Sequence, residues 1–176
     1  MFYQSKNLDK FVKNEINSLK KTNKVKNPNI IKFIEILRSS NNTYFIYEFC
    51  NGGTLEQEMK KKKIYKEKEA LKIFSELLCA MQTIVNMGII HRDVKPENIL
   101  IHKGVMKLAD FGFCRKLEKG ETTRTRVGSP IYMAPEILFD RPYDNRCDIY
   151  SLGVLLYELL YARAPYESNS LPDLKM

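Results

Sequence analysis

Residues 91–100 read HRDVKPENIL, and residues 108–112, a short way along the chain, read LADFG. The first stretch lies between a predicted long helix and a predicted short strand, so it is expected to be a loop held at both ends. Asp93 can accept the proton of an attacking hydroxyl group, while Asn98 and Asp110 supply oxygen ligands of the kind that Mg²⁺ prefers. This combination predicts a phosphoryl-transfer site, because phosphoryl transfer depends on positioning and charge neutralisation more than on covalent chemistry.

The spacing of the neighbouring residues supports this interpretation. Lys95 lies two residues after Asp93 and can hold the oxygens of a phosphoryl group in transfer. Phe111 is apolar and is expected to pack inward. Downstream, residues 128–130 read GSP and residues 134–136 read APE. Each short motif is common in ordinary turns, so the specific signal is their joint order and spacing.

The composition limits the other classes of protein. The chain has 176 residues, of which 44% are hydrophobic and 28% charged, and this suits one globular domain or a little more. Its net charge of +8 can attract nucleic acid, anionic membranes or acidic peptides, but we favour lysines spread over a solvated surface. A nucleic-acid-binding domain would need aromatic residues interleaved with the cations. The lysine run at 60–63 lacks them, so no nucleic-acid partner is expected.

The cysteines and the apolar stretches favour a soluble, cytoplasmic protein. The four cysteines are scattered, without a Cys-x-x-Cys pair, which argues against a zinc ribbon or a disulfide framework and fits a reducing compartment. Residues 1–10 have no apolar core and do not read as a signal peptide. The longest apolar stretch, at 149–160, is too short to span a bilayer comfortably, so no transmembrane segment is expected.

The pattern of apolar residues is typical of a mixed α+β fold. The expected elements are a helix over 6–21, strands over 30–37 and 44–49 joined by a turn at 39–42, a short helix capped by Thr54, a helix over 67–87 ended by Gly88, strands over 99–101 and 105–108, and a helix over 144–161. The last helix is apolar on all sides and is expected to be buried centrally. Residues 48–53 are the expected hinge between the two halves. The lysine run at 60–63 is interpreted as a solvated linker, with a phosphate-binding patch as the alternative.

Together these motifs resemble those of eukaryotic protein kinases of the serine/threonine type over essentially the whole chain. EFCNGG at 48–53, ADFGF at 109–113 and GSPIYMAPE at 128–136 are most similar to the autophagy-initiating Unc-51-like kinases, although calmodulin-dependent and NIMA-like kinases share parts of this pattern. The resemblance implies a bilobal protein-kinase-like fold. Residues 1–50 would be the remnant of the N-lobe, a helix and the strands after it. Residues 51–176 would be a mostly helical C-lobe, incomplete at its C-terminal end.

The resemblance also implies an activity, which is transfer of the γ-phosphate of ATP to serine and threonine hydroxyls of protein substrates, with Mg²⁺ as the metal. Asp93 would be the catalytic base, assisted by Lys95, while Asn98 and Asp110 would hold the metal. The other nucleotide-binding residues that the resemblance implies are Glu15, which pairs with a nucleotide-positioning lysine; Glu48 and Cys50, whose backbone groups meet adenine; Leu100, which floors the ring; and Glu97, whose backbone meets the ribose. An exposed helix carboxylate is the alternative for Glu15.

Substrate choice and regulation follow from the same resemblance. Lys95 after the catalytic Asp is typical of serine/threonine kinases, and Ser129 is similar to the hydroxyl residue that joins the base in the substrate pocket; dual specificity is the alternative. Thr125 lies where the family often carries a switch phosphate, and Arg92 could clamp that phosphate. An upstream kinase acting on Thr125 is therefore an implied partner, with a plain polar loop as the alternative.

Two family features are missing from the sequence. No glycine-rich loop and no Ala-x-Lys strand precede Glu15, and the pattern stops early in the C-lobe, so the resemblance implies a kinase domain cut at both ends. Without a lysine to pair with Glu15 and without a lid over the phosphates, the chain by itself is expected to have little or no kinase activity. A non-catalytic kinase-like binding or scaffold module is the alternative function. The sequence indicates no peptide preference, pathway or oligomeric state.

Overall fold

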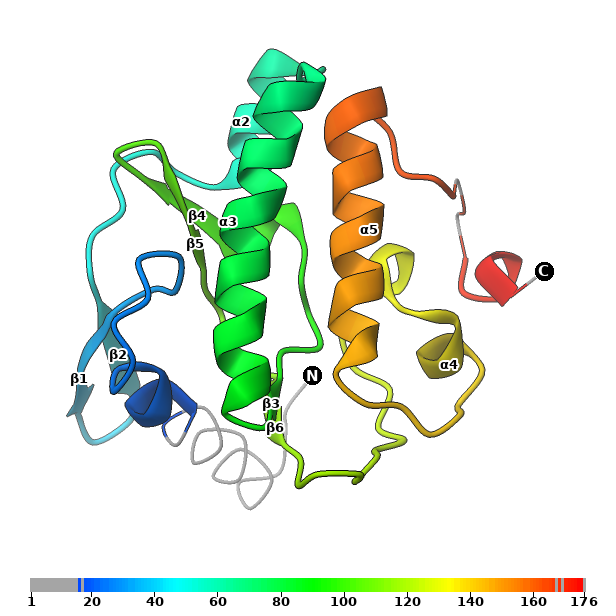
Figure 1. Ribbon diagram of the computed structural model, residues 1–176. Helices are drawn as coiled ribbons and strands as arrows, with labels where there is room; N and C mark the ends of the chain where they lie inside the picture. The colour runs from blue at the N-terminus through cyan, green and yellow to red at the C-terminus, as the bar shows by residue number, and fades with distance from the viewer. Residues whose placement is uncertain (1–15, 17, 167, 169, 176) are drawn as a thin grey trace.

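The structure is a computed structural model that describes residues 16, 18–166, 168 and 170–175. A two-stranded hairpin precedes a mostly helical part, in which two long helices run side by side (Figure 1). The mixed α+β class predicted from the sequence is confirmed. The elements are, in chain order, β1 (Phe33–Arg38), β2 (Thr43–Tyr47), α2 (Leu55–Lys62), α3 (Glu67–Asn86), β3 (Ile89–Ile90), the 3-10 helix η1 (Pro96–Asn98), β4 (Ile99–His102), β5 (Val105–Leu108), β6 (Arg115–Lys116), the 3-10 helix η2 (Pro130–Tyr132), α4 (Pro135–Leu138), α5 (Arg146–Tyr161) and the 3-10 helix η3 (Asp173–Lys175).

The chain before the first strand is only partly described. Within the helix predicted over 6–21, the described residues 16 and 18–21 are helical, and the helix continues to residue 22. Glu15, the predicted partner of a nucleotide-positioning lysine, lies outside the described residues. The turn at 27–29 then leads into β1, as the Asn-Pro-Asn sequence there favours.

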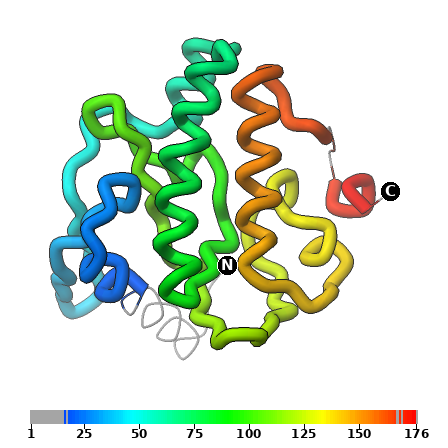
Figure 2. The backbone as a smooth tube through the Cα atoms, viewed as in Figure 1, coloured from blue at the N-terminus to red at the C-terminus, as the bar shows by residue number. Residues whose placement is uncertain are grey.

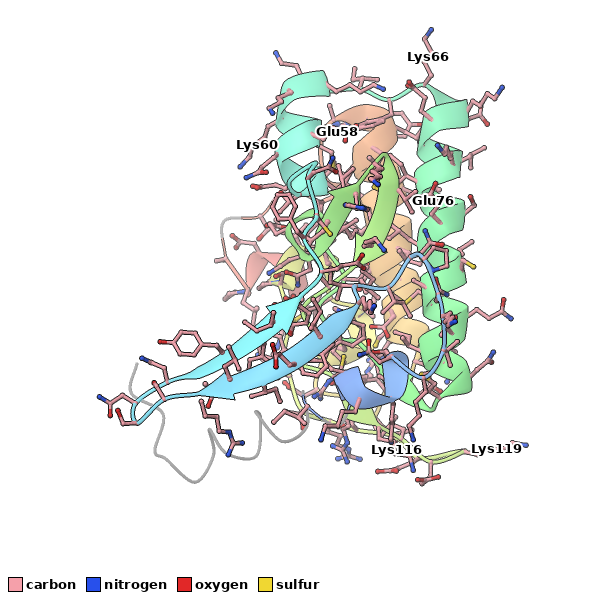
Figure 3. The ribbon with its side chains drawn as sticks, turned by 90° about the vertical axis from the view of Figure 1, so that its left-hand side faces the viewer. Glu58, Lys60, Lys66, Glu76, Lys116 and Lys119 are labelled. Atoms are coloured by element: carbon pink, nitrogen blue, oxygen red, sulfur yellow. The ribbon has the colours of Figure 1, made fainter. Side chains whose placement is uncertain are left out.

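The hairpin of β1 and β2 projects from the helical part of the molecule (Figure 3). The two strands pair antiparallel, with Arg38 opposite Thr43 at the turn, and the register shifts just after Phe33. The ring of Phe33 packs edge-on against Tyr47, with 5.9 Å between their centroids. Both predicted strands are therefore confirmed, because their β-branched and aromatic residues favour a pleated surface.

Thr54 begins α2 with a capping box. Its hydroxyl accepts the Gln57 amide N–H at 3.2 Å, and the Gln57 side chain accepts the Thr54 N–H at 3.1 Å. The predicted linker at residues 60–63 is wrong, because Lys60–Lys62 form the last turn of this helix and Lys63 is its C-cap. Cations in the last turn of a helix interact favourably with its macrodipole, so a lysine run is compatible with a helix end as well as with a linker.

The core lies between α3 and the elements around it. The buried residues of α3 share one face and are Ala70, Ile73, Leu77, Ala80, Met81 and Ile84. This face packs against α5 and β5, and the backbone trace shows the two long helices side by side (Figure 2). The helix ends before Gly88, which has a φ of +67°. A Cβ at Gly88 would lie 2.7 Å from the Leu117 carbonyl oxygen, so glycine is required there for two reasons.

Helix α5 contributes to both buried clusters of the molecule, but it is not covered on all sides. Asp148, Leu152 and Leu155 are buried, as predicted. Ile149 and Tyr161, however, are 47% and 58% exposed, so the prediction that this helix is buried on all sides is wrong. An apolar sequence describes what a helix face could contact, whereas burial depends on which elements actually pack against it.

The strands β4 and β5 connect the helical part to the segment before β1. They pair antiparallel, with Ile99 opposite Leu108. Leu108 also accepts a hydrogen bond from the Ile31 N–H at 2.9 Å and donates one to the Asn29 carbonyl at 2.8 Å. The Asn29 side-chain amide donates to the Met106 carbonyl at 3.0 Å. These bonds fix residues 29–31 against β5.

Two general properties of the surface bear on function. No helix within the described residues is both long and apolar enough to cross a membrane. Lys60 and Lys66 lie at the opposite end of the molecule from Lys116 and Lys119, so these four cations do not form one patch (Figure 3).

Candidate active site

The loop at 91–98 is held in place by hydrogen bonds to Asp148, which lies in the first turn of α5. The Asp148 carboxylate accepts hydrogen bonds from the His91 and Arg92 backbone N–H groups, both at 2.8 Å. Arg92 has a φ of +72°, an unfavourable conformation for a non-glycine residue, and these two bonds hold it there. Asp148 is fully buried, and burial raises the pKa of its carboxyl, while the two N–H groups favour the charged form.

The His91 side chain joins the two sequence motifs. Its Nε2 donates to the Ala109 carbonyl at 3.0 Å, because a carbonyl can only accept. Its Nδ1 is then free to accept the Asp93 N–H, at 3.4 Å. The imidazole also packs edge-on against the ring of Phe111, with 5.2 Å between centroids. The buried Phe111 ring confirms the inward packing predicted from the sequence.

Asp93 is the centre of a polar network. Its side chain is nearly buried, and its Oδ2 accepts a hydrogen bond from Asn98 at 2.8 Å and lies 3.1 Å from the Lys95 ammonium. Its Oδ1 accepts the Ser129 hydroxyl at 3.0 Å, and Lys95 donates to the Ser129 oxygen at 2.7 Å. The structure therefore brings together four of the predicted site residues, three from one loop and one from a segment 36 residues after Asp93.

Gly128 allows Ser129 to approach this network. The glycine has a φ of +107°, and a Cβ there would lie 2.3 Å from the Arg92 carbonyl oxygen. No side chain fits at that distance, so only glycine lets the two segments pass so closely. The sequence marks Gly128 as part of a motif, but the close approach depends on the tertiary fold.

Asn98 and Asp110 each offer an oxygen atom that could bind a cation. The Asn98 side-chain amide donates to both the backbone carbonyl and the carboxylate of Asp93, at 2.8 Å each, which leaves its Oδ1 as an acceptor. The Ala109 N–H donates to the Asn98 carbonyl at 2.9 Å, so Asp110 follows directly beside Asn98. Asp110 is exposed, with a φ of +59°, and its Oδ1 accepts the Gly112 N–H at 3.2 Å.

These two oxygens fit a hard cation that keeps other ligands. Within the part of the chain that the structure describes, no three His, Cys, Asp or Glu side chains lie close enough to hold a metal by themselves. One carboxylate and one amide oxygen suit Mg²⁺, which usually binds one or two protein carboxylates and takes its remaining ligands from phosphates and water. The donor set therefore fits magnesium bound together with a phosphate-bearing ligand.

The predicted adenine-contacting residues lie along the hinge and beside it. The backbone of residues 52 and 53 is bonded to Ile101 of β4, through N–H to carbonyl bonds of 2.8 and 2.9 Å, and Leu100 forms a bridge with Thr54. Cys50 is half-buried, and burial together with the nearby Glu48 charge raises the pKa of its thiol. Glu48, Cys50 and Leu100 thus lie in one region of the fold.

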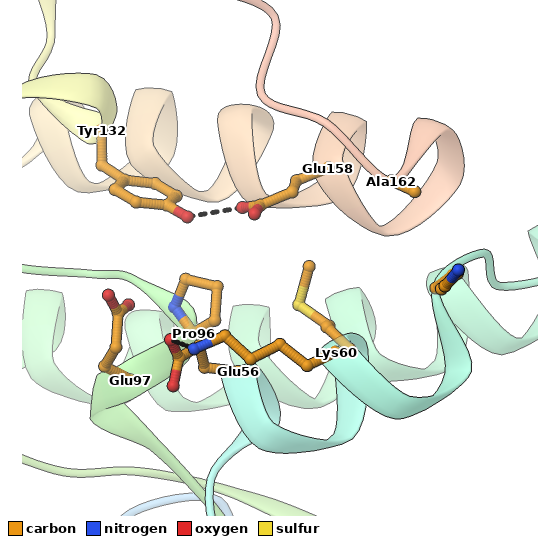
Figure 4. Close-up of a pocket in the computed structure, with 9 residues that line it drawn as sticks. Glu56, Lys60, Pro96, Glu97, Tyr132, Glu158 and Ala162 are labelled. Carbon is orange, nitrogen blue, oxygen red and sulfur yellow. Dashed lines mark hydrogen bonds and ion pairs between the residues drawn. The ribbon is translucent and has the colours of Figure 1, made fainter. Parts of the chain in front are cut away.

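A recess of about 410 Å³ opens beside the catalytic loop, lined on one side by η2 and α5 and on the other by α2 and η1 (Figure 4). Glu97 lines it, and its side chain is exposed there. On the side of the recess opposite Glu97, the Tyr132 hydroxyl donates to the Glu158 carboxylate (Figure 4). Burial raises the pKa of the Glu158 carboxyl, the Tyr132 bond opposes this, and the charges of Glu97 and Glu56 add to it. Sequence analysis assigned no role to Tyr132, although it lies in the motif at 128–136, and none to Glu158.

The segment around Thr125 is tied to the catalytic loop through Tyr143. Thr125 is exposed, and its backbone carbonyl accepts the Tyr143 hydroxyl at 2.6 Å. The Arg92 guanidinium donates to the Phe113 carbonyl at 2.6 Å and lies 3.4 Å from the Tyr143 oxygen. Thr123, by contrast, is buried, and its hydroxyl accepts a hydrogen bond from the Arg115 guanidinium at 2.7 Å. Thr125 is therefore the more accessible of these two threonines.

Comparison with known proteins matches most of the chain to one family. The family described as "Protein kinase domain" matches residues 3–175. Serine/threonine-protein kinase unc-51 of Caenorhabditis elegans is 35% identical over 183 residues, which cover 98% of this chain and 21% of that protein. Serine/threonine-protein kinase ULK3 of Homo sapiens is 38% identical over 154 residues, covering 86% of this chain and 33% of that protein. Serine/threonine-protein kinase ATG1c of Arabidopsis thaliana is 35% identical over 170 residues, covering 94% of this chain and 23% of that protein. The chain thus spans a third or less of the length of these curated relatives.

Proposed function

The chain belongs to the protein kinase family, and from this premise we propose that it carries the catalytic loop and the metal-binding turn of a serine/threonine kinase. The observation that carries the proposal is the network in which the Asp93 carboxylate, the Lys95 ammonium and the Ser129 hydroxyl contact one another. A base, a cation and a hydroxyl-lined acceptor position are the parts that transfer of a phosphoryl group to an alcohol needs. The substrates would be proteins that present serine or threonine.

Asp93 is proposed as the general base. Its Oδ1 accepts a hydrogen bond from the Ser129 hydroxyl, so this oxygen already binds an alcohol of the chemical type that a substrate would present. Lys95 holds a positive charge 3.1 Å from the other carboxylate oxygen, where it can also neutralise a phosphoryl group in transfer. Asp148 positions the loop by binding the two N–H groups that precede Asp93.

Asn98 and Asp110 are proposed to hold magnesium. When bound, ATP supplies the γ-phosphoryl group and Mg²⁺ neutralises the charge of its phosphates. The acceptor oxygen of Asn98 and the exposed carboxylate of Asp110 support this assignment, because both are hard ligands and the backbone bond between Ala109 and Asn98 keeps them adjacent. The backbone of Glu48 and Cys50, the side chain of Leu100 and the backbone of Glu97 are proposed to bind the nucleoside.

Nucleotide binding tests the metal assignment without requiring turnover. We expect ADP to bind the chain only when Mg²⁺ or Mn²⁺ is present, as measured by calorimetry. Asp110→Asn should weaken this binding by about tenfold or more, since it removes the charged ligand. Glu118→Gln is the matched control, because Glu118 is an exposed carboxylate paired with Lys116 and should be neutral for binding. Metal-independent binding, or equal effects of the two variants, would contradict the proposal.

Phosphotransfer tests the role of Asp93. The 176-residue chain is compared with the same chain fused to the glycine-rich loop and strand lysine of a relative. Both are assayed with Mg²⁺-ATP and with peptides that contain a serine, a threonine or a tyrosine as the only acceptor. We expect little turnover from the chain alone and transfer to serine and threonine by the fusion. Asp93→Asn in the fusion should lower the rate by about 10²–10⁴-fold while Mg²⁺-ADP still binds. A fusion that binds nucleotide but transfers nothing would favour the kinase-like scaffold instead.

Thr125 is proposed as a regulatory phosphorylation site. Its exposure and its hydrogen bond from Tyr143, beside Arg92, support this assignment, because a phosphate there could make about 1–3 charge-assisted hydrogen bonds and order the segment. Mass spectrometry after treatment with an activating kinase should find phosphate on Thr125 and none on Thr123. Predominant modification of Thr123 would refute the assignment.

A further inference from the structure

Lys107 is a buried cation outside the proposed catalytic residues. It lies in β5 and is 8% exposed. Its ammonium forms an ion pair of 2.9 Å with the Glu48 carboxylate and donates to the Pro28 carbonyl at 2.9 Å. A buried ammonium is costly unless it is paired and hydrogen-bonded, so these partners keep the lysine charged in this position. The ion pair joins β5 to the first residue of the hinge at 48–53.

Glu48 is held from three directions. The carboxylate oxygen that contacts Lys107 also accepts the Lys32 N–H at 2.9 Å. The Glu48 backbone N–H donates to the Lys32 carbonyl at 2.9 Å. Partial burial alone would raise the pKa of the Glu48 carboxyl, but Lys107 and the Lys32 N–H bind the charged form and the net shift is downward. The side chain of Glu48 therefore joins the hinge to Lys107 and to the backbone of Lys32.

The two ends of the hinge are fastened by different means. At its far end, the backbone of residues 52 and 53 is bonded to Ile101. Between the ends, Phe49 is 81% exposed, Cys50 packs partly against the core, and the Asn51 side-chain oxygen accepts the Lys103 N–H at 3.0 Å. At the near end, Glu48 is held by its contacts with Lys107 and with the backbone of Lys32. Because Lys107 and Glu48 also line a recess of about 470 Å³, apolar packing does not replace the ion pair on that side.

We propose that Lys107 is a positioning residue that fixes the backbone of the hinge through Glu48. When the ammonium is removed, Glu48 loses its charged partner and the segment from 48 to 51 gains freedom. The consequence for nucleotide binding rests on the proposed function, since the backbone of Glu48 and Cys50 is assigned there to adenine. The effect on the hinge itself does not depend on that assignment.

Amide hydrogen exchange in the 176-residue chain tests the effect on the hinge directly. We expect Lys107→Met to speed exchange of the amides of residues 48–51 by about tenfold, while α3 is unaffected. Lys32→Met is the matched control, because it removes a neighbouring exposed charge and leaves the backbone contacts of Lys32 with Glu48 intact. Lys107→Arg should restore slow exchange, since a guanidinium can also pair with Glu48.

A second variant covers the case in which Lys107→Met does not fold. Glu48→Gln keeps the shape of the side chain and removes its charge, and it should speed exchange at the same amides. Unchanged exchange at residues 48–51 in the folded variant, or an equal effect of Lys32→Met, would overturn the proposal.

Affinity for Mg²⁺-ADP separates this proposal from the proposed function. We expect Lys107→Met to raise the dissociation constant by about three- to tenfold and Lys32→Met to leave it unchanged. Faster hinge exchange with unchanged affinity would overturn the positioning role toward nucleotide. If the wild-type chain binds no Mg²⁺-ADP, the proposed function fails, and the exchange data alone decide whether Lys107 fixes the hinge.

Discussion

At the scale of single residues, the site depends on backbone conformations that most residues avoid. Arg92 has a φ of +72° and Gly128 one of +107°, and the two segments approach each other closely. The sequence predicts Asp93, Lys95 and Asn98 as neighbours because they share one short loop. It could not predict the contact between Gly128 and Arg92, which exists only when distant segments are packed together.

Replacing Gly128 by alanine should damage the site more than an alanine at an open glycine. The new Cβ would lie 2.3 Å from the Arg92 carbonyl oxygen, so the segment that carries Ser129 must move away. Gly104→Ala is the control, because Gly104 also has a positive φ, of +77°, but has open space around it. We expect Gly128→Ala to cost about 1–3 kcal/mol more in the free energy of unfolding, measured by urea denaturation. Equal losses would contradict the steric argument.

The ion pair between Glu48 and Lys107 should make stability depend on pH in one direction. The pKa of Glu48 in the folded chain lies below its ordinary value of 4.5, so the folded state binds this proton less readily than the unfolded state. The contribution of the pair is therefore fully present above about pH 4.5 and is lost as the pH falls through the folded pKa.

Thermal unfolding of the wild type and of Glu48→Gln between about pH 3 and 6 checks this expectation. The difference in Tm should be largest near pH 6 and shrink toward pH 3. A difference that grows on acidification would mean that Glu48 is not stabilised in its charged form.

At the scale of elements, the sequence predicts which helices and strands form better than it predicts what packs against them. The helix predicted over 67–87 and the strands over 99–101 and 105–108 match α3, β4 and β5 closely, because apolar spacing is a local property. The two wrong predictions concern context. The lysine run at 60–63 forms the end of a helix, because lysine has a high helix propensity and an exposed lysine is compatible with a helix as well as with a linker. Helix α5 is not buried on all sides, since an apolar pattern does not specify how many neighbours a helix has.

The start of α2 offers a direct test at this scale. Thr54→Ala removes the hydroxyl that accepts the Gln57 N–H, and it should cost about 1 kcal/mol in the free energy of unfolding. Thr122→Ala, at an exposed position in a loop, should cost less than about 0.5 kcal/mol. Urea denaturation of both variants gives the comparison. Equal costs would indicate that the cap is not formed in solution.

At the scale of the whole molecule, function depends on contacts between distant segments. Asp148, Ser129 and Lys107 each contact partners that are far away in the sequence. A short sequence motif gives no information about such long-range contacts. The resemblance to protein kinases gave Ser129 a role before the fold was known. Lys107 could not be found in the same way, because its proposed role depends on burial and on neighbours that only the folded chain provides.

The distribution of charge predicts weak binding to nucleic acid. The net charge is +8, but Lys60 and Lys66 lie at the opposite end of the molecule from Lys116 and Lys119 (Figure 3). We expect fluorescence anisotropy with mixed-sequence oligonucleotides to give dissociation constants no tighter than about 10⁻⁴–10⁻⁶ M at physiological salt. Much tighter binding that is lost when the lysines at 60–63 are changed to glutamine would restore a nucleic-acid role for this surface.

The suspension of the catalytic loop from Asp148 sets an order of events during synthesis. The loop is synthesised before its anchor, since Asp148 follows His91 by 57 positions in the sequence. At about 5–20 residues per second, translation needs some seconds to supply that carboxylate. During this interval no Asp148 carboxylate stabilises the positive φ of Arg92. A nascent chain halted before residue 148 would therefore contain the motif without the loop conformation of the folded protein.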